Sequence, residues 1–240
     1  MIVEICANSF ESAIAAQNGG ANRIELCTQL AVGGLTPTHQ LIKKVMPELS
    51  IPVHVLVRPR KGNFCYSKEE LNIMKNDIEF CKSIGCSGVV SGILKSDLTI
   101  DLIATKQLIE VSNGIDFTFH RAFDCVKDPF KSLKHLIDLK VKRVLSSGLK
   151  PNAIEGISLL TEMNRVANQQ IEIMPGSGIN FDNAIHFKNE GFTSIHLSAT
   201  KQLEKKSISF FERGTEEVSD EKTIRKIVGL VNYCLLYTSP

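Results

Sequence analysis

The sequence predicts an α/β protein of the (β/α)8 TIM-barrel class. Short runs rich in β-branched residues alternate with amphipathic helical stretches along the chain, which is typical of a parallel sheet built from βα units. The runs number eight, and a chain of 240 residues matches the usual size of one such barrel, about 250 residues. We therefore expect a single TIM-barrel domain spanning residues 1–240.

Each expected strand is followed by an expected helix. The strands are expected at Ile2–Cys6, Arg23–Cys27, Val53–Arg58, Gly88–Ser91, Asp116–His120, Arg143–Ser146, Ile171–Pro175 and Ser194–Leu197. The helices are expected at Ser9–Gln17, Thr38–Val45, Ser67–Ile84, Ile100–Ser112, Pro129–Leu139, Ala153–Ala167, Phe181–Asn189 and Asp220–Tyr233. Right-handed crossovers between successive parallel strands would then close the sheet on itself.

Residues at the ends of the helical stretches support these boundaries. Ser67 followed by Glu70 forms a capping box, and Pro129 fits the first turn of its helix. Gly85 and Gly191 stand where the end of a helix needs a positive φ. The boundaries are therefore marked by chemistry as well as by hydrophobic periodicity.

An open, doubly wound sheet is the alternative architecture. Its first strand would lead into a Gly-x-Gly-x-x-Gly turn, and no such turn follows Cys6. The barrel is therefore the better interpretation. After its last strand, residues Thr200–Glu217 form a longer and more polar connection, which we expect to be a flexible loop.

Charge and hydropathy narrow the class of partner. The 28 Lys and Arg and the 26 Asp and Glu give a net charge of +2 and are spread along the chain, so nothing indicates nucleic acid. No apolar run is long enough to span a bilayer, and the first residues lack the basic segment of a leader. We expect a cytoplasmic protein whose partner is a metal ion or a small anionic metabolite, with a homo-oligomer as a further option.

Cysteines end the first two strands. The chain has seven cysteines without regular spacing, and without an export signal they are expected to be thiols. Alternation along a strand puts Glu4 with Cys6, and Glu25 with Cys27, on the same face. Neighbouring strands lie about 4.8 Å apart, so the two thiols can converge on one soft cation, Cu(I) or zinc. The alternative is that each thiol is a small core residue.

The third and fifth strands bring further polar groups to the same edge, where barrels carry their functional residues. Arg58 is expected to project into the mouth of the barrel. It can bind the carboxylate or phosphate of a substrate, or form an internal ion pair with Glu4 or Glu25. His120 ends the fifth strand and can act as a general acid or base or as a metal ligand.

Small and polar residues follow the seventh and eighth strands. Gly176, Ser177 and Gly178 follow one strand, and His196 and Ser198 lie at the end of the next. Barrels frequently bind phosphate at this position, because small residues leave backbone N–H groups exposed. Tight turns alone also account for the glycines. These five residues are therefore candidates for ligand binding.

Several stretches occur together in the order of one known family. They are Glu4–Cys6, Gly19–Cys27, Gly33–Pro37, Arg58–Arg60, Phe64–Ser67, Thr118–Asp124, Ser147–Gly148 and Ile173–Gly176. In these stretches the chain resembles the CutC family, which is named for copper homeostasis. The resemblance implies a (β/α)8 barrel and Cu(I) bound by Cys6 and Cys27, and it implies no particular reaction. Ser177 and Ser91 depart from the family pattern, which has a glycine and commonly an aromatic residue at these positions.

The leading functional hypothesis is copper homeostasis. Cys6 and Cys27 would bind Cu(I) as thiolates and serve in copper buffering or delivery, with His120 available as a third ligand. In a further interpretation, the polar interior is an ion-pair network that only stabilises the barrel. Removing Arg58 would then lower the stability of the protein without changing the binding of any ligand.

The alternative hypothesis is an enzyme that acts on a small phosphorylated or carboxylated metabolite. Arg58 and the turn Gly176–Gly178 would hold the anion, while Glu25 and His120 would serve as acid and base. The polar mouth favours this class more than a simple metal carrier would require.

Overall fold

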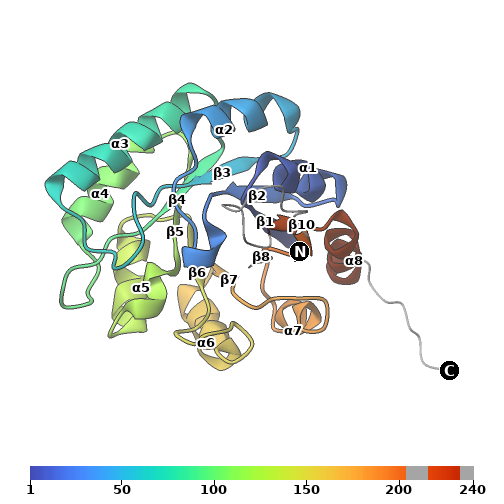
Figure 1. Cartoon of the computed structure of the whole chain (residues 1–240). Helices are drawn as coiled ribbons and strands as arrows, with labels where there is room; N and C mark the ends of the chain where they lie inside the picture. Colours follow the sequence, from blue (N-terminus) through green and yellow to red (C-terminus); the bar gives the residue numbers. More distant parts are fainter. Residues whose placement is uncertain (204–215, 233–240) are drawn as a thin grey trace, which may run out of the picture.

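The computed structural model describes residues 1–203 and 216–232, in which strands and helices alternate from one end to the other (Figure 1). The barrel strands are β1 (Ile2–Ala7), β2 (Arg23–Leu26), β3 (Val53–Leu56), β4 (Gly88–Ser91), β5 (Asp116–Phe119), β6 (Arg143–Ser146), β7 (Glu172–Pro175) and β8 (Ser194–Leu197). The helices are α1 (Phe10–Asn18), α2 (His39–Val45), α3 (Lys68–Ser83), α4 (Leu102–Val111), α5 (Pro129–Asp138), α6 (Ile157–Ala167), α7 (Ala184–Asn189) and α8 (Glu221–Asn232).

The eight parallel strands form one sheet that curls into a barrel, with the helices outside it (Figure 1). They hydrogen-bond in the order β7-β6-β5-β4-β3-β2-β1-β8. A parallel bridge between Gly176 and His196 joins the two outer strands of this order. The predicted TIM barrel is therefore confirmed.

Most element boundaries lie within two residues of their predicted positions. The capping box of Ser67 and Glu70 is present at the start of α3, as predicted. The start of α6 differs more: the helix was expected to begin at Ala153, and it begins at Ile157. The Ala153 amide instead donates to the carbonyl of Ser177, 2.9 Å away, so this segment is tied to the turn after β7.

The expectation of a loop at Thr200–Glu217 is wrong at both ends of that segment. Strands β9 (Thr200–Leu203) and β10 (Glu216–Ser219) pair antiparallel, and the residues between them lie outside the described ranges. Two contacts fasten the pair to the start of α1. The Ser219 amide donates to Ser12 Oγ at 3.0 Å, and Asn8 Nδ2 donates to the Glu217 carbonyl at 2.8 Å.

The two faces of the barrel strands differ in chemistry. Val3, Ile5, Ile24 and Leu26 are fully buried in the apolar layer between the strands and the helices. The opposite face, inside the barrel, carries buried charged and polar side chains, namely Glu4, Arg23, Glu25, His54, Arg143 and His196. Register brings several of these together, since Glu4 is the Cα partner of Arg23 on one side and of His196 on the other.

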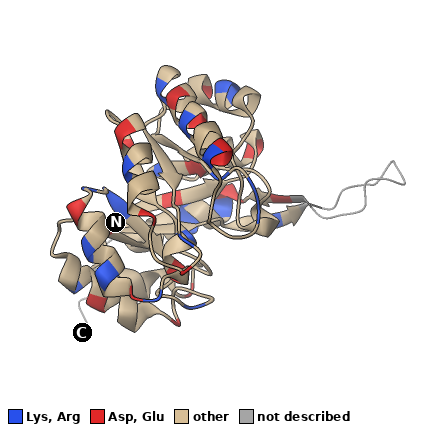
Figure 2. Cartoon of the chain, turned by 90° about the vertical axis from the view of Figure 1, so that its left-hand side faces the viewer, with Lys and Arg blue, Asp and Glu red and all other residues tan. Residues whose placement is uncertain are grey.

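The outer surface has mixed charge. Lys and Arg are interspersed with Asp and Glu over the helices in the view of Figure 2, as the spread of charge along the sequence predicts. Among the helices of the described ranges, none combines the length and the apolar character that crossing a bilayer requires.

Candidate functional site

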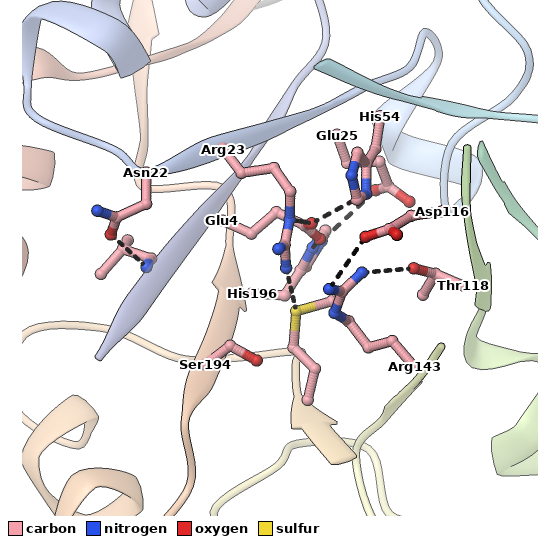
Figure 3. Close-up of polar contacts among 12 residues, drawn as sticks. Glu4, Asn22, Arg23, Glu25, His54, Asp116, Thr118, Arg143, Ser194 and His196 are labelled. Atoms are coloured by element: carbon pink, nitrogen blue, oxygen red, sulfur yellow. Dashed lines mark hydrogen bonds and ion pairs between the residues drawn. The ribbon is translucent and has the colours of Figure 1, made fainter. Parts of the chain in front are cut away.

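A buried carboxylate lies at the centre of the polar interior (Figure 3). Glu4, on β1, is fully buried, and the Arg23 guanidinium from β2 donates to its Oε2. His196 Nδ1 lies 2.8 Å from Oε1, and His54 Nδ1 lies 3.8 Å from Oε2. Burial alone would raise the pKa of Glu4, but Arg23 and then His196 hold that pKa well below its usual range. Glu4 is therefore a permanent carboxylate held by neighbours on three strands.

The contact with Glu4 orients the ring of His196. A carboxylate only accepts hydrogen bonds, so Nδ1 of His196 carries the proton and Nε2 is left facing Glu25, whose Oε2 is 3.6 Å away. Burial would lower the pKa of His196, but Glu25 and the hydrogen bond with Glu4 outweigh it and raise that pKa. Burial, and then the charge of Glu4, raises the pKa of Glu25. This carboxylate–histidine pair is the arrangement that proteins use to aim an imidazole at a metal.

The two strand-end thiols lie side by side, as alternation along β1 and β2 predicts. The Sγ atoms of Cys6 and Cys27 are 3.5 Å apart, and both residues are free thiols. They pack with Leu56 and Val90, so their surroundings on that side are apolar. Contact with Cys27, and then burial, raises the pKa of Cys6 well above its usual value. The pair is thus buried at the mouth of the barrel, and the raised pKa favours the protonated thiol of Cys6.

Three different ligand types meet beside this pair. Cys6, Glu25 and His196 each offer one atom, and the three atoms lie within 4.8 Å of one another. Thiolate sulfur, imidazole nitrogen and carboxylate oxygen together suit a transition metal better than a hard cation. His120, which the sequence offered as a third ligand, is not a member of this group.

A cavity of about 540 Å³ opens in front of these groups. Eight of the residues singled out in the sequence line it, namely Cys6, Glu25, Arg58, His120, Ser177, Gly178, His196 and Ser198. Cys27 lies behind Cys6, fully buried. Gly176 does not line the cavity either, because its backbone bridges to His196 and a Cβ there would lie 2.5 Å from Leu145 Cδ1. Gly176 thus has a packing role at the barrel seam.

Arg58 does not form the ion pair that was one of its two predicted roles. Its Nη1 donates to the carbonyls of Val32 and Gly34 at 2.9 and 3.0 Å, and its Nη2 donates to the carbonyl of Gly62 at 3.1 Å. The guanidinium also lies over the ring of Phe64, 4.9 Å from the centroid. Its hydrogen bonds therefore go to two loops, and the cation of the interior ion pair is Arg23.

His120 has a different chemical state from the one that an acid–base role needs. Its Nδ1 accepts the amide N–H of Ala122 at 3.1 Å. Burial, followed by the charge of Arg58, lowers the pKa of His120 to about 3. The ring is therefore neutral at physiological pH, with its proton on Nε2, and it is a weak base. A ring with so low a pKa is poorly suited to general acid–base catalysis near neutral pH.

Sequence reasoning missed two features of the site. Arg23 could have been found, because the alternation that points Glu25 into the barrel points Arg23 there as well. Asp124 could not, because its role depends on the turn after β6. Its carboxylate accepts from Ser146 Oγ at 2.6 Å and from the Ser147 amide at 3.0 Å, and Arg121 pairs with it.

Comparison with known proteins agrees with this fold. Residues 1–201 match the model of the CutC family. The chain belongs to the CutC family. A CutC-family protein of Pasteurella multocida is 45% identical over 199 residues, which cover 82% of this chain and 82% of the relative. Another, from Glaesserella parasuis serovar 5, is 41% identical over 242 residues and covers 98% of this chain and 100% of the relative.

Solved structures show the same relation. The CutC protein of Streptococcus agalactiae, described as a copper homeostasis protein, has a TM-score of 0.78 and 35% identity, covering 82% of this chain and 98% of its own. The thiamine phosphate pyrophosphorylase of Pyrococcus furiosus has a TM-score of 0.61 at 12% identity, covering 96% of this CutC-family chain and 95% of its own. The second likeness shows the barrel fold alone.

Removing the cation beside Glu4 tests the importance of the buried pair. We expect Arg23→Met to lower the free energy of unfolding by about 3–5 kcal/mol, because it leaves a buried carboxylate without its partner. Urea unfolding followed by circular dichroism measures the change. Arg225→Met is the matched control, since Arg225 pairs with Glu221 on an exposed face and that pair contributes less than about 1 kcal/mol. Equal effects of the two substitutions would contradict the role given to Glu4.

The protonation state of His120 can be observed directly. Because the pKa of His120 is about 3, we expect the ring of the folded protein to remain the neutral Nε2–H tautomer at every pH above about 4. NMR of the ring nitrogens and Cε1–H against pH measures this. The urea-unfolded chain is the control, in which the same histidine should titrate near pH 6.5. A titration midpoint above about pH 5 in the folded protein would show that His120 is available as a base.

Proposed function

We propose that this chain binds Cu(I) through the sulfurs of Cys6 and Cys27 and acts in copper homeostasis, as a buffer or a delivery protein. The observation that carries the proposal is the free thiol pair, with its Sγ atoms 3.5 Å apart at the mouth of the barrel. Membership of the CutC family supports it, as does the description of the Streptococcus agalactiae relative as a copper homeostasis protein.

The donor set favours Cu(I) over the other soft or borderline ions. Thiolates select Cu(I) and zinc, but structural zinc sites take four ligands, usually with more than two thiolates or with several histidines. Among the described residues two thiols converge here, and they lie against the apolar side chains of Leu56 and Val90. A buried site of low coordination number suits a monovalent soft ion, which brings little charge to be desolvated.

The spacing of the sulfurs also bears on coordination. With metal–sulfur bonds of about 2.3 Å, sulfurs 3.5 Å apart subtend roughly 100° at the metal, which is far from a linear arrangement. A bent pair leaves room for a third ligand. His196 is the best candidate, because it belongs to the same cluster as Cys6 and its Nδ1 is engaged by Glu4, so the neutral ring would offer Nε2 to a metal. We therefore propose a site of two thiolates and one imidazole.

The chemistry of the pair fits a reducing compartment. Thiols this close would be exposed to oxidation in a secreted protein, whereas the cytoplasm keeps them reduced. We accordingly propose that the protein works in the cytoplasm. Copper would reach the site through the cavity, meeting Cys6 first, because Cys6 lines the cavity and Cys27 lies behind it.

A competition titration tests the proposal. Cu(I) is added to the protein against a chromophoric Cu(I) chelator under anaerobic conditions. Changes outside the ligand set of a metal site commonly cost 10- to 100-fold in affinity, so we expect Cys6→Ser/Cys27→Ser to lose more than about 100-fold. The matched control is Cys65→Ser/Cys81→Ala, which removes two thiols away from the site and should keep the wild-type affinity. Unchanged affinity in the Cys6→Ser/Cys27→Ser protein would sink the proposal.

A further inference from the structure

Arg58 is a buried cation with no carboxylate beside it. The residue is 6% exposed, and in the part of the chain that the structure describes its hydrogen bonds all go to carbonyls, those of Val32, Gly34 and Gly62. Its Nε–H is buried and has no hydrogen-bond partner. Carbonyl dipoles solvate a guanidinium in part, but they leave its full positive charge uncompensated in a setting where unpaired charge is costly.

Tyr66, whose pKa Arg58 acts to lower, does not supply the missing charge. The Tyr66 hydroxyl is also buried without a hydrogen-bond partner. Burial raises the pKa of Tyr66, despite the opposing effect of Arg58, so this hydroxyl stays neutral at physiological pH. Arg58 is thus left with one free N–H and one unbalanced charge.

A second unpartnered donor faces the same cavity. His120 is 5% exposed, its Nδ1 accepts from Ala122, and its Nε2–H has no hydrogen-bond partner among the described residues. A buried N–H of this kind is rare, because leaving it unsatisfied costs the desolvation of the group. Its position therefore points to an acceptor that comes from outside the chain.

The side chains of Arg58 and His120 both pack against one aromatic ring, that of Phe64. Arg58 Cζ is 4.9 Å from the centroid of Phe64, and the ring centroid of His120 is 5.0 Å from the same point. All three residues line the cavity of about 540 Å³, which lies in the size range of small-molecule sites. The two residues, which follow β3 and β5, thus border one space, and each keeps a buried N–H without a partner among the described residues.

We propose that Arg58 Nε–H and His120 Nε2–H bind the carboxylate of a small organic acid in this cavity. A carboxylate has two oxygens and one negative charge, which matches two single N–H donors and one unbalanced cation. A phosphate suits the site less well. It carries more charge and prefers the two-pronged end of a guanidinium, and here both terminal nitrogens of Arg58 are already bound to backbone.

The walls of the cavity indicate what the rest of the acid is like. The apolar lining residues are Leu30, Val32, Leu56, Leu145, Ile179 and Leu197. They would enclose an aliphatic body, while Glu25, Arg121, Asp124 and His196 add polar groups to the same lining. The inference does not rest on copper binding, because neither donor belongs to the cluster of Cys6, Glu25 and His196.

NMR of metal-free protein tests the inference on the two protons concerned. The probes are acetate, butyrate and inorganic phosphate, each titrated at constant ionic strength. Arg58→Lys identifies the Arg58 Nε–H resonance by its absence. We expect butyrate to shift the Arg58 Nε–H and His120 Nε2–H resonances together, with one saturable Kd that is lower than that of acetate. Failure of both carboxylates to shift these resonances would overturn the inference, and so would tighter binding of phosphate.

Variants separate this site from the copper site. A hydrogen bond to a charged group contributes about 1.5–3 kcal/mol, so His120→Phe should weaken butyrate binding by about tenfold or more. His39→Phe is the control, since His39 stacks on Phe80 at the surface and should leave Kd unchanged. Cys6→Ser/Cys27→Ser protein should bind butyrate with less than a threefold change, whatever its affinity for Cu(I). An unchanged Kd in His120→Phe would contradict the proposed role of His120, and the wild-type titration decides the matter if that variant does not fold.

Discussion

The interior of this barrel depends on one buried carboxylate. Glu4 has no access to water, so its charge requires compensation from within, and Arg23, His54 and His196 supply it from β2, β3 and β8. Strands β2 and β8 flank β1, and β3 lies next to β2. This single charge therefore links the first strand of the chain to the last strand of the barrel. The same contact holds the proton of His196 on Nδ1 and aims Nε2 at the space between Glu25 and Cys6. Stability and the geometry of the candidate site therefore share one interaction.

The cavity in front of this network has two chemically different sides. One part of its lining carries sulfur and imidazole, from Cys6 and His196. The other carries N–H donors without acceptors, from Arg58 and His120, next to the ring of Phe64. A site built only to hold a metal would have no use for a buried cation on its opposite wall, because that charge disfavours a cation nearby. The arrangement is easier to understand if the cavity takes an anion as well.

The sequence was sufficient for the fold and for part of the site. Eight alternating units without a Gly-x-Gly-x-x-Gly turn after the first strand favour a barrel. A period of two along the strands puts Cys6 and Cys27 on one interior face. Both properties are local and repeat along the chain. The partners of Arg58 could not be predicted in the same way, since they are carbonyls in loops whose path depends on tertiary packing. His196 was a ligand-binding candidate, but its contact with Glu4 was not predicted, because that contact depends on the pairing of β1 with β8.

X-ray absorption at the copper edge of Cu(I)-loaded protein tests the central claim most directly, because it reports the atoms bound to the metal. If Glu4 orients His196 toward the metal, the wild-type spectrum should show two sulfur neighbours and one nitrogen neighbour. In His196→Gln protein the nitrogen neighbour should be lost and the two sulfurs kept. A wild-type spectrum with two sulfurs in a linear arrangement and no nitrogen would contradict the part given to His196. A spectrum without sulfur would contradict the site itself.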